Sequence, residues 1–378
     1  MKKVIIARWG EIHLKGGNKD FFVKKLKSNL SKSLEGLATV KIDGTRLVID
    51  NFEQENKVLK KVIQTFGIVS ASISNVTVAT PEAITQFLKN LQIKGTFKVT
   101  VNRACKSFPV KSMDFAATCG GVILDNNPQA KVDVINPDTL VHIDIRESNN
   151  TYISDNSFNG PGGLPVGVSG KGIVLLSGGI DSPTAAFQAA KRGLAVEFIH
   201  FATPPYTSQM ALDKVERLVK TLEEYVGKTT LYVIPFTQIS KAIQKHCDPG
   251  YMITIMRRYM IRIAEQIGKS VGASCIITGE NLAQVASQTI QGIASNNFVA
   301  TTLPILRPLI TYDKYEIIDL AKRIGTYETS IEPHQDCCTV FVPAKPVIKP
   351  DLKKVEAQEA KLKDIVNLED PVYNRSSN

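Results

Sequence analysis

Long apolar runs are missing from this 378-residue sequence. It has no stretch of about 18 apolar residues, and the apolar stretch near its N-terminus is too short for a signal peptide. We therefore expect a cytoplasmic protein without a membrane span. The length exceeds that of a single core of about 150 residues, so two or three domains are expected. The apolar fraction of 43% and the charged fraction of 22% are ordinary for a globular protein.

Paired cysteines are also missing. Six cysteines are present, and none of them form a CxxC pair. This spacing argues against a disulfide framework and against a zinc or iron–sulfur site with four cysteine ligands. Cys275 lies in an apolar run and is expected in the core. Cys337 and Cys338 lie in a polar loop after the last expected strand–helix unit, where α/β proteins commonly carry chemistry.

Acidic residues are in the minority, with 36 Asp and Glu against 46 Lys and Arg. The imbalance is strongest in the first 32 residues, where Glu11 and Asp20 accompany this basic set: Lys2, Lys3, Arg8, Lys15, Lys19, Lys24, Lys25, Lys27 and Lys32. Such a cluster is typical of proteins that bind polyanions. The solvated face of a helix over residues 20–34 would explain the same lysines. A nucleotide-activating loop elsewhere in the chain would favour RNA as the partner.

Such a loop is present at residues 177–182, which read SGGIDS. It follows an apolar run at 172–176, expected to be a strand, and precedes an alanine-rich stretch at 183–191, expected to be a helix. Pro183 suits the first turn of that helix. The two glycines let the backbone approach an anion, and the two serine hydroxyls and the free amides of the helix can donate to phosphate oxygens. We predict a phosphate-binding loop rather than a plain glycine turn.

A Walker loop does not explain this chain, because GxxxxGK[ST] would have to lie between a strand and a helix. The pair Gly227-Lys228 leads into a strand-like run at 230–234, and Gly170-Lys171 lies before its strand. We therefore favour cleavage of ATP at the α-phosphate over chemistry at the γ-phosphate.

The first part of the chain is expected to contain two successive α/β alternations, the first of which suits a small ferredoxin-like sandwich. The predicted strands are 4–8, 39–43, 46–49, 70–77, 96–102, 131–135, 140–145 and 151–154. The predicted helices are 20–34, 54–64, 81–91 and 113–124. A segment rich in glycine and proline, 159–167, is predicted to be a linker.

The rest of the chain alternates strands and helices, which predicts a parallel, doubly wound sheet. The predicted strands are 172–176, 196–201, 231–236 and 274–278, with a further one at Ile305. The helices for which we predict bounds are 183–191, 252–267, 314–324 and 353–363.

Seven segments together resemble the tRNA 4-thiouridine synthetase family, the tRNA sulfurtransferases that thiolate a uridine near the acceptor stem. The similarity covers essentially the whole chain. The matching segments are RWGEIHLKG (8–16), NPD (136–138), GGLPVG (162–167), SGGIDSP (177–183), LRPLI (306–310), DK (313–314) and DCC (336–338).

The resemblance implies an N-terminal ferredoxin-like domain over 1–60, a THUMP domain that binds tRNA over 61–165, and an adenylating pyrophosphatase-loop domain over 166–378. Some family members carry a C-terminal rhodanese domain. We expect this chain to be a short form without one, since it ends at Asn378. A role in thiamine biosynthesis, which in the family depends on that domain, is left open.

The resemblance also implies a reaction. Uracil O4 is adenylated with release of pyrophosphate, and a persulfide on Cys338 then attacks C4, giving 4-thiouridine at position 8 and AMP. Asp181 is expected to bind Mg²⁺, with a helix cap as the alternative. Lys314 matches a family lysine needed for activity, with a solvated lysine as the alternative. The expected sulfur donor is a cysteine desulfurase, the expected assembly is a homodimer, and the role of Cys337 is left open.

The binding residues follow from the same resemblance. Arg257 can stabilise phosphate charge or be a plain surface residue. The expected ATP contacts are Leu175, Leu176, Ser177, Gly178, Gly179, Asp181, Ser182, His200, Phe201, Arg257, Gly279 and Gln288. The expected tRNA contacts are Arg8, Lys15, Lys24, Arg103, Lys106 and Lys111.

Two other functions compete with sulfur transfer. An amide-forming ligase would share the SGGIDS loop but would need neither the basic N-terminal domains nor Cys338. An RNA-binding protein with a decayed loop would not be expected to keep Asp181, both serines and both glycines. Thiolases that use an iron–sulfur cluster need paired cysteines, and CxxC is absent.

Overall fold

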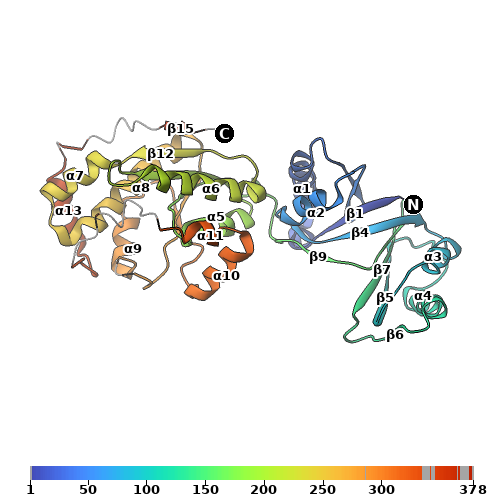
Figure 1. Cartoon of the computed structure of the whole chain (residues 1–378). Coiled ribbons are helices and arrows are strands. Elements are labelled where there is room, and N and C mark those ends of the chain that lie inside the picture. Colours follow the sequence, from blue (N-terminus) through green and yellow to red (C-terminus); the bar gives the residue numbers. More distant parts are fainter. Residues whose placement is uncertain are drawn as a thin grey trace. The chain divides into compact units, whose positions relative to one another are not determined.

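The structure is a computed structural model that describes residues 2–285, 287–333, 341, 345–363, 365–366 and 374–376. The chain divides into two compact units, Met1–Pro165 and Val166–Asn378 (Figure 1). Each unit has its own hydrophobic core. In the described part of the chain, no helix is long and apolar enough to cross a membrane.

The first unit is built on one nine-stranded sheet with the strand order β2-β3-β1-β4-β8-β7-β5-β6, and β9 pairs with β4. Its strands are β1 (Lys3–Trp9), β2 (Thr39–Asp43), β3 (Arg46–Asp50), β4 (Ile68–Val78), β5 (Thr96–Arg103), β6 (Lys131–Val132), β7 (Thr139–Ile145), β8 (Asn150–Ser154) and β9 (Phe158–Asn159). Its α-helices are α1 (Lys19–Ser33), α2 (Glu55–Gln64), α3 (Pro81–Leu88) and α4 (Ser112–Asn126). A 3₁₀ helix over Glu11–Asn18 precedes α1.

Strand β4 joins the two halves of this sheet. One edge of β4 pairs antiparallel with β1, and the other edge pairs antiparallel with β8. The half that contains β5, β7 and β8 has a core in which Phe97 and Ile143 of the sheet and Phe115 of α4 are buried together. The two predicted alternations therefore share one continuous sheet.

Two local predictions for this unit were wrong. The strand predicted over 131–135 ends at Val132, because Asp133 Oδ1 accepts the backbone N–H groups of Ile135 and Asn136 at 2.8 and 3.0 Å. Such a side-chain turn competes with strand pairing. The helix predicted over 81–91 ends at Leu88.

The segment predicted as a linker is partly structured. The N–H groups of Gly160 and Gly162 donate to Val69 O at 2.9 Å and Ile68 O at 2.8 Å, continuing the pairing of β9 with β4. A Cβ atom on Gly160 would lie 2.3 Å from Ile68 O, so glycine is required there. The first half of the linker thus belongs to the first unit.

The second unit contains a six-stranded sheet with the order β14-β13-β10-β11-β12-β15. Strands β10 to β14 pair parallel, as predicted, and β15 adds an antiparallel edge that was not predicted. The strands are β10 (Lys171–Leu175), β11 (Ala195–Ala202), β12 (Leu231–Pro235), β13 (Cys275–Ile277), β14 (Ile305–Leu306) and β15 (Asn374–Ser376).

The helices of this unit pack in two groups (Figure 1). One group consists of α5 (Asp181–Lys191), α6 (Gln209–Val226), α10 (Lys314–Ile324) and α11 (Tyr327–Ser330). The other consists of α7 (Thr237–His246), α8 (Met252–Ser270), α9 (Ile290–Asn297) and α13 (Leu352–Ala360). Since β10 has β11 on one side and β13 on the other, its carboxyl end is the switch point at which doubly wound sheets bind ligands.

Helix α13 is attached to α8 by a buried ion pair. Both Glu359 oxygens accept from the Arg258 guanidinium, at 2.9 and 2.8 Å, and both accept from Arg262 at 2.8 Å. The Arg258 side chain is 2% exposed and Glu359 is 11% exposed. Burial alone would raise the pKa of Glu359, but its hydrogen bonds to Arg262 and Arg258 lower it below its ordinary value.

We predict that Glu359→Ala destabilises the second unit by about 3–5 kcal/mol, because it leaves the buried Arg258 charge without its negative partner. The measurement is urea unfolding of the full chain, followed by circular dichroism and by tryptophan fluorescence. The single tryptophan, Trp9, is buried in the first unit, so its transition should stay unchanged. Glu356→Ala, an exposed position on the same helix, is the control. Equal shifts for the two variants would contradict the ion-pair argument.

Candidate active site at the carboxyl end of β10

The loop between β10 and α5 is stabilised by hydrogen bonds of its own serines. Ser182 Oγ accepts the backbone N–H of Ser177 at 2.8 Å, and the two hydroxyl oxygens lie 3.0 Å apart. The N–H of Gly179 donates to Ser177 Oγ at 3.3 Å. Helix α5 begins at Asp181, which places Pro183 in its first turn, as predicted. The free N–H groups and positive dipole end of α5 therefore lie beside the loop.

Gly279, which follows β13, packs against this loop. A Cβ atom on Gly279 would lie 2.7 Å from the backbone nitrogen of Ser182 and 2.9 Å from the backbone carbon of Asp181. The missing side chain thus lets the segment after β13 lie directly against the start of α5.

Asp181 receives two donors from distant parts of the chain. Lys314, at the start of α10, places Nζ 2.5 Å from Asp181 Oδ1. Gln284 donates from Nε2 to Asp181 Oδ2 at 2.8 Å. The helix-cap alternative for Asp181 is not seen. The N-cap position of α5 is occupied by Ile180, and no side chain caps this helix at that position. Two residues that the sequence placed in catalysis, Asp181 and Lys314, are in direct contact.

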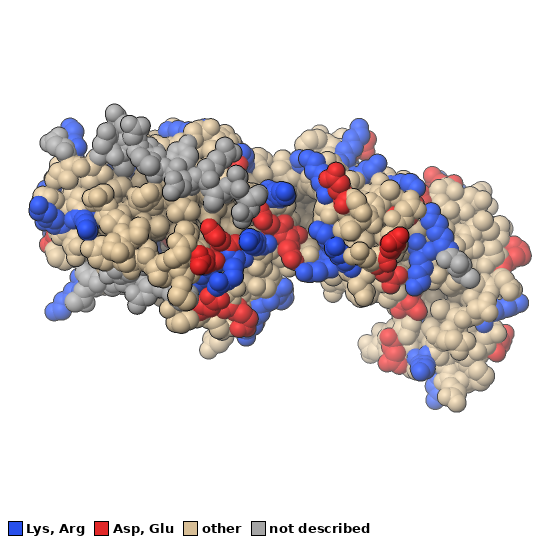
Figure 2. Space-filling model, turned by 45° about the horizontal axis from the view of Figure 1, so that its top comes forward, with Lys and Arg blue, Asp and Glu red and all other residues tan. Residues whose placement is uncertain are grey.

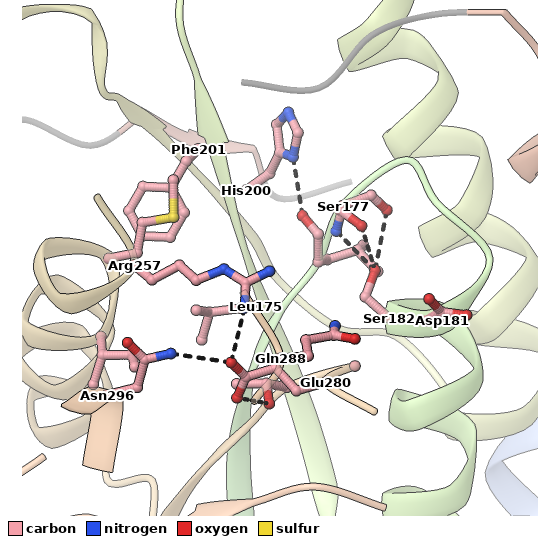
Figure 3. A pocket seen from close by; sticks show the side chains of 15 residues that line it. Leu175, Ser177, Asp181, Ser182, His200, Phe201, Arg257, Glu280, Gln288 and Asn296 are labelled. Carbon is pink, nitrogen blue, oxygen red and sulfur yellow. Dashed lines mark hydrogen bonds and ion pairs between the residues drawn. The ribbon is translucent and has the colours of Figure 1, made fainter. Parts of the chain in front are cut away.

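A cavity of about 270 Å³ opens beside the loop (Figure 3). Its walls come from β10, the loop, β11, α8, the segment after β13, and α9. The lining residues are Leu175, Leu176, Ser177, Asp181, Ser182, His200, Phe201, Arg257, Met260, Ile261, Thr278, Gly279, Glu280, Gln288 and Asn296. A cavity of this size at a switch point suits a small ligand with an anionic group.

Glu280 organises one wall of the cavity. It pairs with Arg257 at 3.1 Å and accepts from Asn296 Nδ2 at 3.1 Å (Figure 3). It also pairs with Arg307 at 2.7 Å. Burial alone would raise the pKa of Glu280, but the charges of Arg257 and Arg307 lower it below its ordinary value. Glu280 therefore stays ionised and holds the Arg257 guanidinium at the cavity.

Two amide oxygens of the cavity wall have no hydrogen-bond partner among the described residues. They are Gln288 Oε1 and Asn296 Oδ1, and both atoms are buried. A buried acceptor without a donor costs about 1–3 kcal/mol, so a ligand that donates to these oxygens would recover that cost. Nearby, His200 Nδ1 lies 3.0 Å from Leu176 O, which orients the imidazole at the end of β11.

Comparison with known families shows to which family the chain belongs. A model described as "Thiamine biosynthesis protein (ThiI)" matches residues 167–363, the ThiI ferredoxin-like domain matches 4–72, and the THUMP domain matches 58–154. The chain belongs to the ThiI family. The predicted fold class is thereby confirmed: a ferredoxin-like domain, a THUMP domain and a pyrophosphatase-loop domain.

Solved structures agree with this assignment. The chain is 34% identical to a protein solved as a 4-thiouridine synthetase–RNA complex with bound ATP, with a TM-score of 0.87 over 100% of this chain and 99% of the other. It is 24% identical to PH1313 from Pyrococcus horikoshii Ot3, with a TM-score of 0.67 over 85% and 99% of the two chains. The second likeness shows the fold alone.

The chain brings most of the predicted ATP contacts to one cavity. Gly178 and Gly179 belong to the loop but do not line the cavity, whereas the other predicted residues do. Their roles in nucleotide binding stay predictions. Cys338, with Cys337, lies outside the described residues. The sequence interpretation missed Met260, Ile261, Thr278, Glu280, Gln284 and Asn296.

A sequence signal existed for only some of the missed residues. Thr278 is the last residue of a predicted strand and Glu280 follows it by two positions, so the switch-point rule could have included both. Asn296 gives no such signal, because it reaches Glu280 from a helix for which the sequence interpretation set no bounds.

The predicted tRNA contacts of the first unit differ in their surroundings. Arg8 is half-buried and donates to Ser72 at 2.9 Å, and Arg103 donates to Phe108 O at 2.9 Å. Lys15 pairs with Glu11 at 3.6 Å. The exposed members of the predicted set are Lys24, Lys106 and Lys111.

Figure 2 shows Lys and Arg side chains gathered in a band over one face of the first unit, with Asp and Glu beside them. Lys2 and Lys3 at the N-terminus pair with Asp50 and Glu55, which lie outside the basic stretch seen in the sequence. Part of the basic charge is therefore balanced within the unit.

We predict that Gly279→Ala loosens the loop, because overpacking against backbone costs about 1–3 kcal/mol. Amide hydrogen exchange of residues 177–184, followed by mass spectrometry, should accelerate in the folded chain. Gly120→Ala on α4 is the control, since a Cβ atom there meets nothing within 4 Å. Unchanged exchange in Gly279→Ala would contradict the close packing described above.

Proposed function

We propose that the chain is a tRNA uracil 4-sulfurtransferase that makes 4-thiouridine at position 8 of tRNA. Uracil O4 attacks the α-phosphorus of ATP and pyrophosphate leaves. The outer sulfur of a persulfide on Cys338 then attacks C4, and AMP leaves with the former O4. A thiol finally attacks the Cys338 sulfur of the remaining S–S bond, which frees 4-thiouridine and leaves Cys338 in a disulfide.

The observation that carries this proposal is the contact between Asp181 and Lys314 beside the SGGIDS loop, at the switch point of the sheet. Loop amides, a helix N-terminus and a lysine converge there, as chemistry on a phosphate requires. Membership of the ThiI family and the likeness to a 4-thiouridine synthetase solved with RNA and ATP support the same reaction.

The cavity provides groups that complement a nucleotide. Arg257 offers a positive charge that Glu280 holds in place. The acceptors Gln288 Oε1 and Asn296 Oδ1 need donors, and the amino group of adenine supplies N–H groups. We infer that the adenine lies toward these amides and that the phosphates lie toward Ser177 and Ser182.

The Asp181 carboxylate fits Mg²⁺, a hard cation that prefers oxygen ligands. Bound there, Mg²⁺ would neutralise phosphate charge. Lys314 pairs with the same carboxylate, which holds its ammonium beside the loop, where it would also neutralise phosphate charge. Both residues are therefore assigned to phosphate chemistry and not to sulfur transfer.

The remaining assignments complete the proposal. The first unit, with domains at 1–60 and 61–165, binds tRNA through its basic surface, and the domain at 166–378 adenylates the uridine. A cysteine desulfurase provides the persulfide sulfur in the cytoplasm, and two copies of the chain act as a homodimer.

We predict that the chain, given unmodified tRNA, Mg-ATP, cysteine and a cysteine desulfurase, forms 4-thiouridine, detected by mass spectrometry of digested nucleosides. Asp181→Ala should abolish both pyrophosphate release and thiouridine. Cys338→Ser should abolish thiouridine and leave pyrophosphate release. Cys247→Ser is the control, because burial raises the pKa of that thiol and makes it a poor nucleophile.

The same assay separates the competing functions. Pyrophosphate and AMP without thiouridine in the wild-type chain would point to a ligase with another acceptor. Thiouridine formation that survives Cys338→Ser would remove Cys338 from the reaction. An absence of both products would contradict the enzyme assignment.

We predict that Lys24→Ala, Lys106→Ala and Lys111→Ala weaken tRNA binding and flatten its salt dependence. Each lost phosphate contact should reduce the slope of log K against log [salt] by about 0.7–0.9. The measurement is filter binding of tRNA between 50 and 200 mM salt, roughly the range over which such contacts are resolved. Lys220→Ala, an exposed position on α6, is the control. Slopes equal to the wild-type slope would exclude these lysines from the interface.

A further inference from the structure

Asp181 and Lys314 have roles in the proposed reaction, but Gln284 has none so far. Its side-chain amide donates to Oδ2 of Asp181, and Lys314 donates to Oδ1. We propose that Gln284 is a positioning residue, which orients the Asp181 carboxylate for its divalent cation. This inference rests on the proposed function, because it takes Asp181 as the residue that binds the cation.

The backbone fixes Gln284 in place. The two residues before Gln284 are both hydrogen-bonded: the N–H of Leu282 donates to Ile310 O at 3.1 Å, and the N–H of Ala283 donates to Gln288 O at 2.8 Å. Ala283 has a φ of 64°, in the left-handed region that costs a non-glycine residue about 1–2 kcal/mol. Such conformations persist where their surroundings impose them, and they are frequent next to active sites.

The chemistry of an amide suits this position. Lys314 and a divalent cation would both be attracted to the same carboxylate, so the orientation of Asp181 decides which oxygen each would meet. A lysine or arginine in place of Gln284 would oppose the incoming cation, and a carboxylate would compete for it. The Gln284 amide donates to Oδ2 without adding a charge, so it would orient the carboxylate without opposing the cation.

A purely structural role for Gln284 explains less. Its other polar atom, Oε1, is buried and has no partner among the described residues. A glutamine that served only to hold the loop would gain stability by satisfying both ends of its amide, since a buried unpaired acceptor costs about 1–3 kcal/mol. The hydrogen bond to Asp181 is thus retained although the other end of the amide is left unsatisfied.

The experiment compares Gln284→Ala and Gln284→Met, which retains the side-chain volume, with the wild-type chain. Mn²⁺ binding is measured by electron paramagnetic resonance in the presence of a non-hydrolysable ATP analogue. Removal of a hydrogen-bond donor to a metal ligand typically lowers the affinity for the metal by about 10–100-fold. We expect both variants to lose Mn²⁺ affinity in that range. The affinity for the analogue without metal should not change.

A second measurement does not depend on metal or activity. Acetylation of Lys314 by acetic anhydride, quantified by mass spectrometry in the nucleotide-free chain, should accelerate in both variants, because Asp181 is no longer held against the lysine. Gln188→Ala is the matched control. Its amide also makes one hydrogen bond, to Tyr312 Oη at 2.7 Å, and does not touch Asp181.

The outcomes separate this inference from the proposed function. Wild-type Mn²⁺ affinity and wild-type Lys314 acetylation in both Gln284 variants would overturn the positioning role, whether or not the chain thiolates tRNA. Weaker Mn²⁺ binding in Gln188→Ala as well would overturn it by showing a general loosening of the site. Weaker binding confined to the Gln284 variants supports it, even if the wild-type chain forms no thiouridine.

Discussion

The wall of the cavity depends on one buried carboxylate. Glu280 balances Arg257 on α8 and Arg307 after β14, so two guanidinium groups share a single negative charge. Arg307 is 9% exposed and Arg257 is 21% exposed, so Arg257 is the more accessible of the two. The site therefore keeps a net positive charge for an anion without leaving two buried arginines to repel each other.

The segment that carries Glu280 also connects the other parts of the site. Gly279 lies against the start of α5, and Gln284 reaches Asp181. Between them, Asn281 donates to Leu309 O at 2.9 Å and to Tyr312 O at 2.5 Å, which fixes the turn before α10 and thus the position of Lys314. Residues 279–284, in the segment after β13, therefore fix the loop, the arginines and the lysine relative to one another.

Local patterns were enough to predict part of this structure. The strand, loop and helix around SGGIDS are neighbours in sequence, and the alternation of strands and helices predicts a parallel sheet. The contact between Gln284 and Asp181 was not predictable in this way, because the two residues are 103 positions apart. The strand predicted at 131–135 was too long, and the segment predicted as a linker at 159–167 is paired in its first half, for a similar reason. The strand ends because Asp133 accepts backbone hydrogen bonds, and the linker segment is ordered because Gly160 and Gly162 donate to β4. Both features depend on particular hydrogen bonds rather than on composition.

Strand β4 gives the first unit a property that its two family matches do not suggest. The ferredoxin-like match ends at residue 72 and the THUMP match begins at residue 58, so both include the start of β4. Because this strand is hydrogen-bonded along both edges, a cut on either side of it would leave one half with an unpaired edge. The two sequence domains therefore share one sheet, and replacing either half by a homologous module would require rebuilding the strand they have in common.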